Sequence, residues 1–236
     1  MRYLRSGAVS KYVILIAISI FSNPQFASAQ QATQCFSIEF FYDSSTGDAS
    51  ELRASLEKFA DERKGLLLNF RDVHEDEKVQ QRLDQIAKHF GLAEISLPAM
   101  YGLNNIIADL KSKEQVESRL SKILQLTAYV RNGCPHCAAA KAFLGKYGDR
   151  YPALKIVYNE VITSQAANQE MQAVVRRYRQ QAASLPVIHY CNGLTIGFDR
   201  EATTGRKVMQ TLDYWSRACS DEKKTAQKKA SRDFKS

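Results

Sequence analysis

The sequence is poor in long apolar segments, which limits how it can meet a membrane. No run other than Val13–Phe21 is strongly apolar over such a length, and that run is too short to cross a bilayer comfortably as a helix. Three basic residues precede it, and the small residues Ala27 and Ala29 follow it. This order is typical of a cleaved secretory signal peptide. We therefore predict that residues 1–29 are such a signal, and an uncleaved anchor is the alternative.

The sequence also lacks signals for other destinations. No lipidation signature precedes Cys35, and residues 233–236 are not an endoplasmic-reticulum retention signal. Together with the signal peptide, these absences favour a bacterial periplasm. That compartment is oxidising, so we expect its cysteines to form disulfides more often than metal sites.

Basic residues are not interleaved with aromatic ones, and we therefore expect no nucleic-acid binding. The formal net charge is +8, and loss of the three basic residues of the signal would leave +5. Part of this charge lies in Lys223–Arg232, which is polar and has no apolar stripe. We predict that residues 221–236 form a flexible basic tail. Weak attraction of the tail to an anionic membrane surface or partner is the alternative.

Few residues could complete a metal centre at the paired cysteines. The chain has five cysteines and four histidines. Cys134 and Cys137 have the spacing of half a zinc site, but only His189 and Cys191 could complete it, with a spacing that fits poorly. His74 stands beside three acidic residues, which we interpret as a solvated turn. We therefore expect no metal and no other cofactor.

One stretch with clear chemistry remains, Asn132–Cys137. An apolar and β-branched segment typical of a strand precedes it, and strong helix formers follow it. Cys134 thus lies where a strand leads into a helix, and Pro135 suits the first helical position. Backbone N–H groups and the helix dipole favour a thiolate there. His136 adds a donor, and positive charge when protonated, beside that sulfur.

The strand, Cys134-Pro-His-Cys137 and the helix resemble the active site of thioredoxin-fold thiol–disulfide oxidoreductases. The flanking residues are most similar to glutaredoxin-like members, and the Pro-His pair to periplasmic disulfide oxidases of the DsbA type. The resemblance implies that Cys134 attacks a disulfide and that Cys137 resolves the mixed disulfide. It also implies that Pro135 and His136, the two residues between the cysteines, influence how strongly the cysteine pair oxidises.

The pattern of elements occurs twice, which predicts an α/β protein with two tandem thioredoxin-like domains. Apolar periodicity gives the order β-α-β-α-β-β-α in residues 30–125 and again in 126–220. Ser96-Leu97-Pro98 recurs as Ser184-Leu185-Pro186 at the same place in each unit. A shared tripeptide with a matching element order supports an internal duplication.

The third strand of each unit starts near a proline. By resemblance, Pro186 is a cis-proline beside Cys134, and Leu185 before it meets an incoming extended substrate. An ordinary trans-proline at the start of an edge strand is the alternative.

The first unit has no thiol where the second has its cysteine pair. Residues 43–48 read Asp-Ser-Ser-Thr-Gly-Asp at that place. This unit therefore cannot exchange disulfides there. We expect it to serve as a spacer, a docking surface or a module through which the chain forms a homodimer.

In the fold that the resemblance implies, Cys191 and Cys219 lie far from the active site. Cys191 lies in the hairpin turn at the opposite end of the domain, and Cys219 follows the last helix to the same end. We therefore predict a structural Cys191–Cys219 disulfide. The alternative is that Cys35, near the junction of the units, captures Cys191 or Cys219.

The leading functional prediction is an exported thiol–disulfide oxidoreductase acting on protein thiols and disulfides, recharged by a membrane redox partner. The Pro-His pair favours an oxidase. However, the segment between Tyr147 and Ser184 has no room for the helical insertion of the DsbA type, and Leu185 differs from the usual residue before the cis-proline. Oxidase, reductase and isomerase directions therefore remain open. The rival prediction is a binding or chaperone-like module with regulatory thiols.

Overall fold

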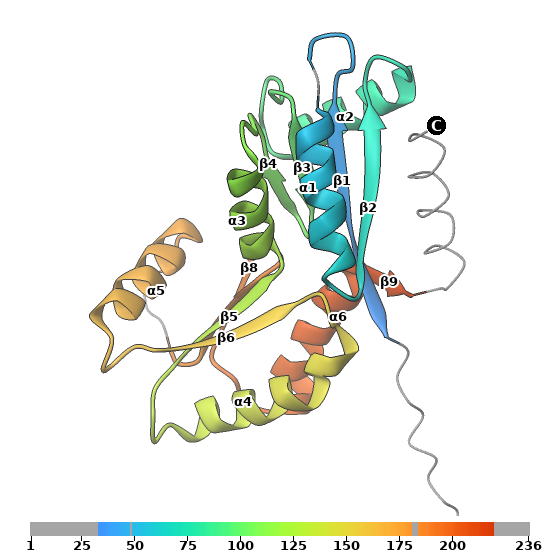
Figure 1. Ribbon diagram of the computed structural model, residues 1–236. Coiled ribbons are helices and arrows are strands. Elements are labelled where there is room, and N and C mark those ends of the chain that lie inside the picture. The colour runs from blue at the N-terminus through green and yellow to red at the C-terminus, as the bar shows by residue number, and fades with distance from the viewer. Residues whose placement is uncertain (1–32, 48, 181–183, 220–236) are drawn as a thin grey trace, which may run out of the picture. The chain divides into compact units, whose positions relative to one another are not determined.

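The computed structural model describes residues 33–47, 49–180 and 184–219 (Figure 1). The predicted signal peptide and basic tail lie outside these residues. Within the described ranges, no helix is long and apolar enough to span a membrane.

The first unit has the predicted order of elements. Its central strand β1 pairs with β2 in parallel and with β3 in antiparallel orientation, and β4 pairs with β3. The elements are β1 (Gln34–Tyr42), α1 (Ser50–Asp61), β2 (Leu66–Asp72), α2 (Glu77–His89), β3 (Ala99–Gly102), β4 (Asn105–Ile107) and α3 (Lys113–Ile123).

Alternation along β1 explains how helices cover both faces of this sheet. Phe36, Ile38 and Phe40 point to one face and pack with the apolar stripes of α1 and α3. Phe41 points to the other face and packs against α2. Successive side chains of a strand point to opposite faces, so a strand that is apolar at both parities is covered on both sides.

The second unit repeats the arrangement. Its sheet has the order β6-β5-β7-β8, with β5 and β6 parallel and the other pairs antiparallel. The elements are β5 (Gln125–Val130), α4 (Pro135–Tyr147), the 3₁₀ turn η1 (Gly148–Arg150), β6 (Lys155–Glu160), α5 (Gln165–Arg177), β7 (Val187–Tyr190), β8 (Gly193–Ile196), the π-helical turn η2 (Glu201–Gly205) and α6 (Arg206–Trp215).

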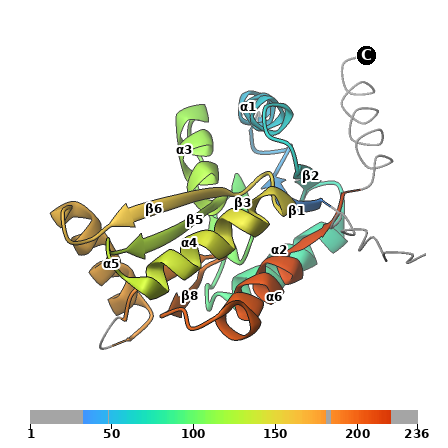
Figure 2. The same ribbon diagram turned by 90° about the horizontal axis from the view of Figure 1, so that it is seen from below.

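The helices of this unit divide between the two faces of its sheet. Leu126, Ala128 and Val130 of β5 pack with α4 and α6, whereas Tyr129 packs with α5. Helices α4 and α6 lie side by side (Figure 2). The fold is therefore α/β with two tandem thioredoxin-like units, as the sequence predicted.

The hairpins of the two units match in detail, in line with the predicted duplication. The Leu97–Pro98 and Leu185–Pro186 peptide bonds are both cis, which confirms the prediction for Pro186. Each hairpin turn has two residues with positive φ, and the second of them is an asparagine, Asn104 or Asn192. In each unit a side chain from the end of the preceding helix bonds this asparagine.

A further strand departs from the predicted order. After α6 the chain continues as β9 (Ser216–Ala218), which pairs antiparallel with residues 34–36 of β1 in the first sheet. The last residues of the second unit therefore complete the sheet of the first.

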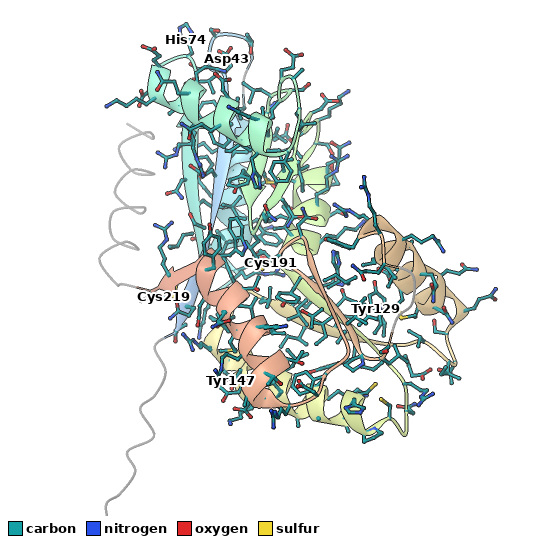
Figure 3. All side chains as sticks on the ribbon, turned by 180° about the vertical axis from the view of Figure 1, so that it is seen from behind. Asp43, His74, Tyr129, Tyr147, Cys191 and Cys219 are labelled. Atoms are coloured by element: carbon teal, nitrogen blue, oxygen red, sulfur yellow. A yellow bond between two sulfur atoms is a disulfide. The ribbon has the colours of Figure 1, made fainter. Side chains whose placement is uncertain are left out.

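This strand corrects the predicted disulfide. Cys219 is bonded to Cys35, with a Cα–Cα distance of 5.2 Å, and Cys191 is a free, buried thiol. Cys219 directly follows β9, and Figure 3 shows Cys219 and Cys191 at separate places. The predicted Cys191–Cys219 pair is wrong because the chain does not stop at the end of α6. It crosses to β1, where Cys35 lies, as the alternative allowed.

The two units share apolar packing as well as the disulfide. One continuous cluster of buried side chains contains residues from both sheets. The rings of Phe36 and Tyr151 stack across it with centroids 5.9 Å apart. The predicted border near residue 125 falls at the start of β5, in a chain whose two units share one apolar cluster.

Candidate active site at the Cys134–Cys137 pair

The candidate active site begins where β5 leads into α4. Gly133 has a φ of +73°, a conformation that glycine adopts without steric cost. It turns the chain so that Cys134, with extended backbone, becomes the N-cap of α4, and Pro135 takes the first helical position. The alanines and other strong helix formers that follow continue the helix.

The sulfur of Cys134 is the capping acceptor of this helix. The Cys137 backbone N–H donates to Cys134 Sγ at an N···S distance of 3.2 Å. Serine, threonine and aspartate oxygens usually fill this role, and they satisfy N–H groups that the helix leaves without a partner. The partial positive charge of the helix start also favours an anion at this place.

The two thiols have opposite tendencies to ionise. Burial alone would raise the pKa of Cys134, but hydrogen bonds from the Cys137 thiol and amide, with the charge of Arg131 and the His136 amide, outweigh it and lower the pKa. Burial and the hydrogen bond to Cys134 raise the pKa of Cys137. Cys134 is 7% exposed and Cys137 is 1% exposed. The arrangement therefore favours a thiolate at Cys134 and a protonated thiol at Cys137.

The His136 side chain is bound to the backbone of a distant segment. Its Nδ1 lies 2.7 Å from the carbonyl oxygen of Phe198, at the end of the segment that follows β8. The predicted direct support of the Cys134 thiolate by the His136 ring stays a prediction.

The segment after β8 links the cis-proline to the helix with the cysteines. The Gly197 N–H donates to the Pro186 carbonyl at 2.8 Å, and the next residue is Phe198, whose carbonyl accepts from His136. The side chains of Leu185 and Cys134 belong to the same apolar cluster. Leu185 also packs against the cluster on the opposite face of this sheet, so the placement of Leu185 and Pro186 beside the cysteine pair, and their contact with a substrate, stay predictions.

Glu160, at the end of β6, connects the two loops that flank the other side of the site. Its carboxylate accepts from the backbone N–H groups of Asn132, Ile162 and Thr163, and from the Thr163 hydroxyl. These bonds from the Thr163 side chain and the three amides lower the pKa of Glu160. The loop before Cys134 is therefore fastened to the loop after β6.

Arg131, Glu160 and Phe198 act at this site, and the motif did not point to them. Arg131 precedes the motif by three residues, and its charge sign was the one available signal. The other two residues reach the site through long-range contacts that a local pattern does not encode.

Cys191 and the first unit do not extend this site. Burial raises the pKa of Cys191 to about 12, so its thiol stays protonated and unreactive. In the first unit, Asp43 accepts hydrogen bonds from the amide and hydroxyl of Ser45, and Asp72 accepts from the His74 amide. Figure 3 shows Asp43 and His74 at one end of that unit. In the part of the chain that the structure describes, no cluster of metal-binding side chains is found.

No family model and no curated protein matches the sequence. Among solved structures, the chain is similar to the NTD_N/C domain of alkylhydroperoxide reductase AhpF from Enterococcus faecalis, with 13% identity, 77% of this chain and 92% of that chain covered, and a TM-score of 0.26. It is also similar to the first two thioredoxin domains of Naumovozyma dairenensis Eps1p, with 12% identity, coverage of 86% and 99%, and a TM-score of 0.24. A protein disulfide oxidoreductase from Aeropyrum pernix gives 16% identity, coverage of 79% and 86%, and a TM-score of 0.23. Because these scores are low, the fold assignment depends on the strand pairing of this chain, and the function on its site.

Proposed function

We propose that the protein is an exported thiol–disulfide oxidoreductase that exchanges disulfides with protein substrates through Cys134 and Cys137. The observation that carries the proposal is the N-cap position of Cys134, whose sulfur accepts the Cys137 amide N–H. A thiolate there attacks a substrate disulfide, or the Cys134–Cys137 disulfide is attacked by a substrate thiolate. In both directions the mixed disulfide forms at Cys134, and the less exposed Cys137 resolves it.

The pKa of the Cys134 thiol bears on the direction of exchange. Groups that lower this pKa stabilise the reduced protein more than the oxidised one, which makes the disulfide a stronger oxidant. The oxidase direction is therefore our first proposal, with a membrane redox partner that reoxidises the pair and a periplasmic location. The first unit, which has no thiol at the corresponding place, then serves as a spacer, a docking surface or a dimerisation module.

The reduction potential tests the direction. The mature protein is equilibrated with glutathione buffers, and the fraction of the Cys134–Cys137 disulfide is measured by alkylation and mass spectrometry. A value near about −120 mV is expected for an oxidase, and one near about −230 to −270 mV would assign a reductase instead. If the fraction of the Cys134–Cys137 disulfide does not change across the buffers, the proposal of an enzyme is overturned and a binding module is favoured.

A pair of cysteine variants tests the catalytic residue. Cys134→Ser removes the attacking sulfur, and we expect it to abolish catalysed reduction of insulin by dithiothreitol. Cys191→Ala is the matched control because it removes another buried free thiol, in the turn between β7 and β8. Equal activity of the Cys134→Ser variant and the wild type would contradict the proposal.

A further inference from the structure

The hydrogen bond of His136 defines which of its ring nitrogens carries a proton. A carbonyl oxygen only accepts, so the short contact from Nδ1 to the Phe198 carbonyl, at 2.7 Å, requires a proton on Nδ1. In the neutral ring, Nε2 is then the nitrogen with a free lone pair. His136 is exposed at the start of α4, two residues from Cys134. The Cys134 sulfur meanwhile takes its hydrogen bond from the Cys137 amide.

The peptide unit that accepts this proton is held at both ends. The carbonyl of Phe198 faces His136, and the N–H of the same peptide, from Asp199, donates to Thr204 Oγ1 at 3.4 Å. The Phe198 ring is buried and lies against Phe143 with centroids 5.5 Å apart. The orientation of this carbonyl is thus set by packing on one side and by η2 on the other.

Asp199 closes the turn that fixes this peptide. Its carboxylate accepts from the Arg200 N–H at 2.7 Å and from the Thr204 N–H at 3.1 Å. The hydroxyls of Thr203 and Thr204 also donate to it. These bonds, the two hydroxyls first, hold the pKa of Asp199 well below its usual range. The carboxylate is therefore an anion that binds four donors of its own loop.

We propose that the loop Phe198–Gly205 makes His136 a base for disulfide exchange, by holding its proton on Nδ1 and leaving Nε2 free to accept the proton of an attacking thiol. The inference rests on the proposed function and assigns roles within it. His136 is a further catalytic residue beside the two cysteines, and Asp199 and Thr204 are positioning residues that act through the Phe198 carbonyl.

The proton and electrons balance within the site. The substrate S–H bond breaks and its proton moves to His136 Nε2. The substrate sulfur bonds to Cys134 Sγ, and the Cys134–Cys137 bond breaks with its electron pair on Cys137 Sγ. Cys137, a thiol of raised pKa, takes the proton from the imidazolium. The oxidant is the Cys134–Cys137 disulfide itself.

The tautomer can be read directly from the ring ¹⁵N shifts of the oxidised, full-length protein, with the His136 signals assigned by comparison with His136→Gln. At a pH where the ring is neutral, we expect a protonated Nδ1 and an unprotonated Nε2 in the wild type. Asp199→Ala and, independently, Thr204→Val should shift the population toward a protonated Nε2. Asp43→Ala is the matched control, since it removes a carboxylate that caps hydroxyl and amide groups in the unit without thiols.

The catalytic part is tested by the rate at which dithiothreitol reduces the Cys134–Cys137 disulfide. Loss of a general base costs about 10²-fold or more, so His136→Gln should slow the reaction at pH 7 by about that factor and Asp199→Ala by a smaller one. Well above the ordinary thiol pKa of about 8.5, the attacking thiol is ionised without help and the rates should converge with the wild type. The cysteines do not titrate in the disulfide. The charged groups on α4 and on the loop that binds the ring are Lys141, Lys146, Asp199, Arg200 and Glu201, and Arg131 precedes the motif. Hydrogen bonds hold the pKa values of Asp199 and Glu201 below their usual ranges, so both carboxylates stay ionised over the pH range of the assay.

Three results would overturn the inference: a wild-type ring protonated on Nε2, a tautomer unchanged in both Asp199→Ala and Thr204→Val, or a His136→Gln rate reduced equally at all pH values. Failure of the proposed function would look different, because the wild-type disulfide would then resist dithiothreitol while the ¹⁵N shifts stayed as expected.

Discussion

Cys134 and Cys137 lie three residues apart, yet the structure shifts the pKa values of their thiols in opposite directions. Hydrogen bonds and the charge of Arg131 lower the pKa of Cys134 in spite of its burial, and burial raises the pKa of Cys137. Because the folded state lowers the pKa of Cys134, ionisation adds to the stability of the reduced protein above the ordinary thiol pKa. That contribution is lost as the pH falls through the lowered value.

The pH profile of alkylation tests this division. In the reduced protein, iodoacetamide should modify Cys134 well before Cys137, with a midpoint below the ordinary thiol pKa of about 8.5. Arg131→Ala should move the midpoint upward and slow modification at mildly acidic pH about threefold, the size expected of a charge interaction near the surface. Arg179→Ala is the control, because it removes a positive charge beyond α5, away from the motif. A midpoint at or above 8.5 in the wild type would contradict the N-cap assignment.

At the scale of elements, the start of α6 is packed closely against α4. A Cβ atom built on Gly205 would lie 2.8 Å from the Phe143 ring. Phe143 also contacts the ring of Phe198, whose carbonyl binds His136. The glycine therefore allows η2 to approach α4 and keeps the active-site loop in place.

Two glycine variants should have opposite effects on stability. Gly205→Ala forces the Phe143 ring or the η2 backbone to move, and we expect a loss of about 1–3 kcal/mol in the free energy of unfolding. Gly145→Ala, on α4 with nothing within 4 Å of the added atom, should stabilise by about 0.5–1 kcal/mol because alanine suits a helix interior better. Urea denaturation of both variants measures this, and equal stability of the two would contradict the packing described.

At the scale of the whole molecule, the end of the described chain is joined to its first strand. Strand β9 returns the end of the second unit to the first strand of the first, and the Cys35–Cys219 bond joins residues 184 apart in sequence. One apolar cluster runs through both units. A disulfide, a strand pair and shared packing thus connect the two units. The candidate thiol chemistry lies in the second unit alone.

Removal of the disulfide should weaken the fold and spare the chemistry. On the chain-entropy model, a loop of this length contributes about 5 kcal/mol, so Cys35→Ser/Cys219→Ser should lower the melting temperature markedly. Exchange activity at a temperature where the variant is folded should stay close to that of the wild type. Cys191→Ala is the control for loss of a buried sulfur. Loss of exchange in the folded double variant would show that the bond takes part in the redox cycle.

Local pattern predicted most of the fold and the centre of the site. Helical periodicity, alternating strands and the repeated Ser-Leu-Pro predicted both units, and the Cys134-Pro-His-Cys137 motif located the thiols. The resemblance to thioredoxin-fold oxidoreductases predicted that Pro186 is cis. Strand β9 has three residues and no distinctive pattern, and it is defined by pairing with β1 alone. The Cys35–Cys219 bond depends on that pairing. The Phe198 carbonyl is a backbone group whose role no residue type signals, so the tautomer of His136 could not be read from the motif.

Because Cys35 pairs with a cysteine that follows β9, the native disulfide can form only late in the synthesis of the chain. Synthesis proceeds from the N-terminus, so Cys35 is present long before its partner, which follows 184 residues later. In that interval Cys134, Cys137 and Cys191 are completed one after another, and each is a free thiol in the finished fold. A nascent chain that reaches an oxidising compartment from its N-terminus therefore offers Cys35 three wrong partners before the right one. Correct maturation depends on keeping Cys35 reduced, or on releasing early bonds, until β9 arrives.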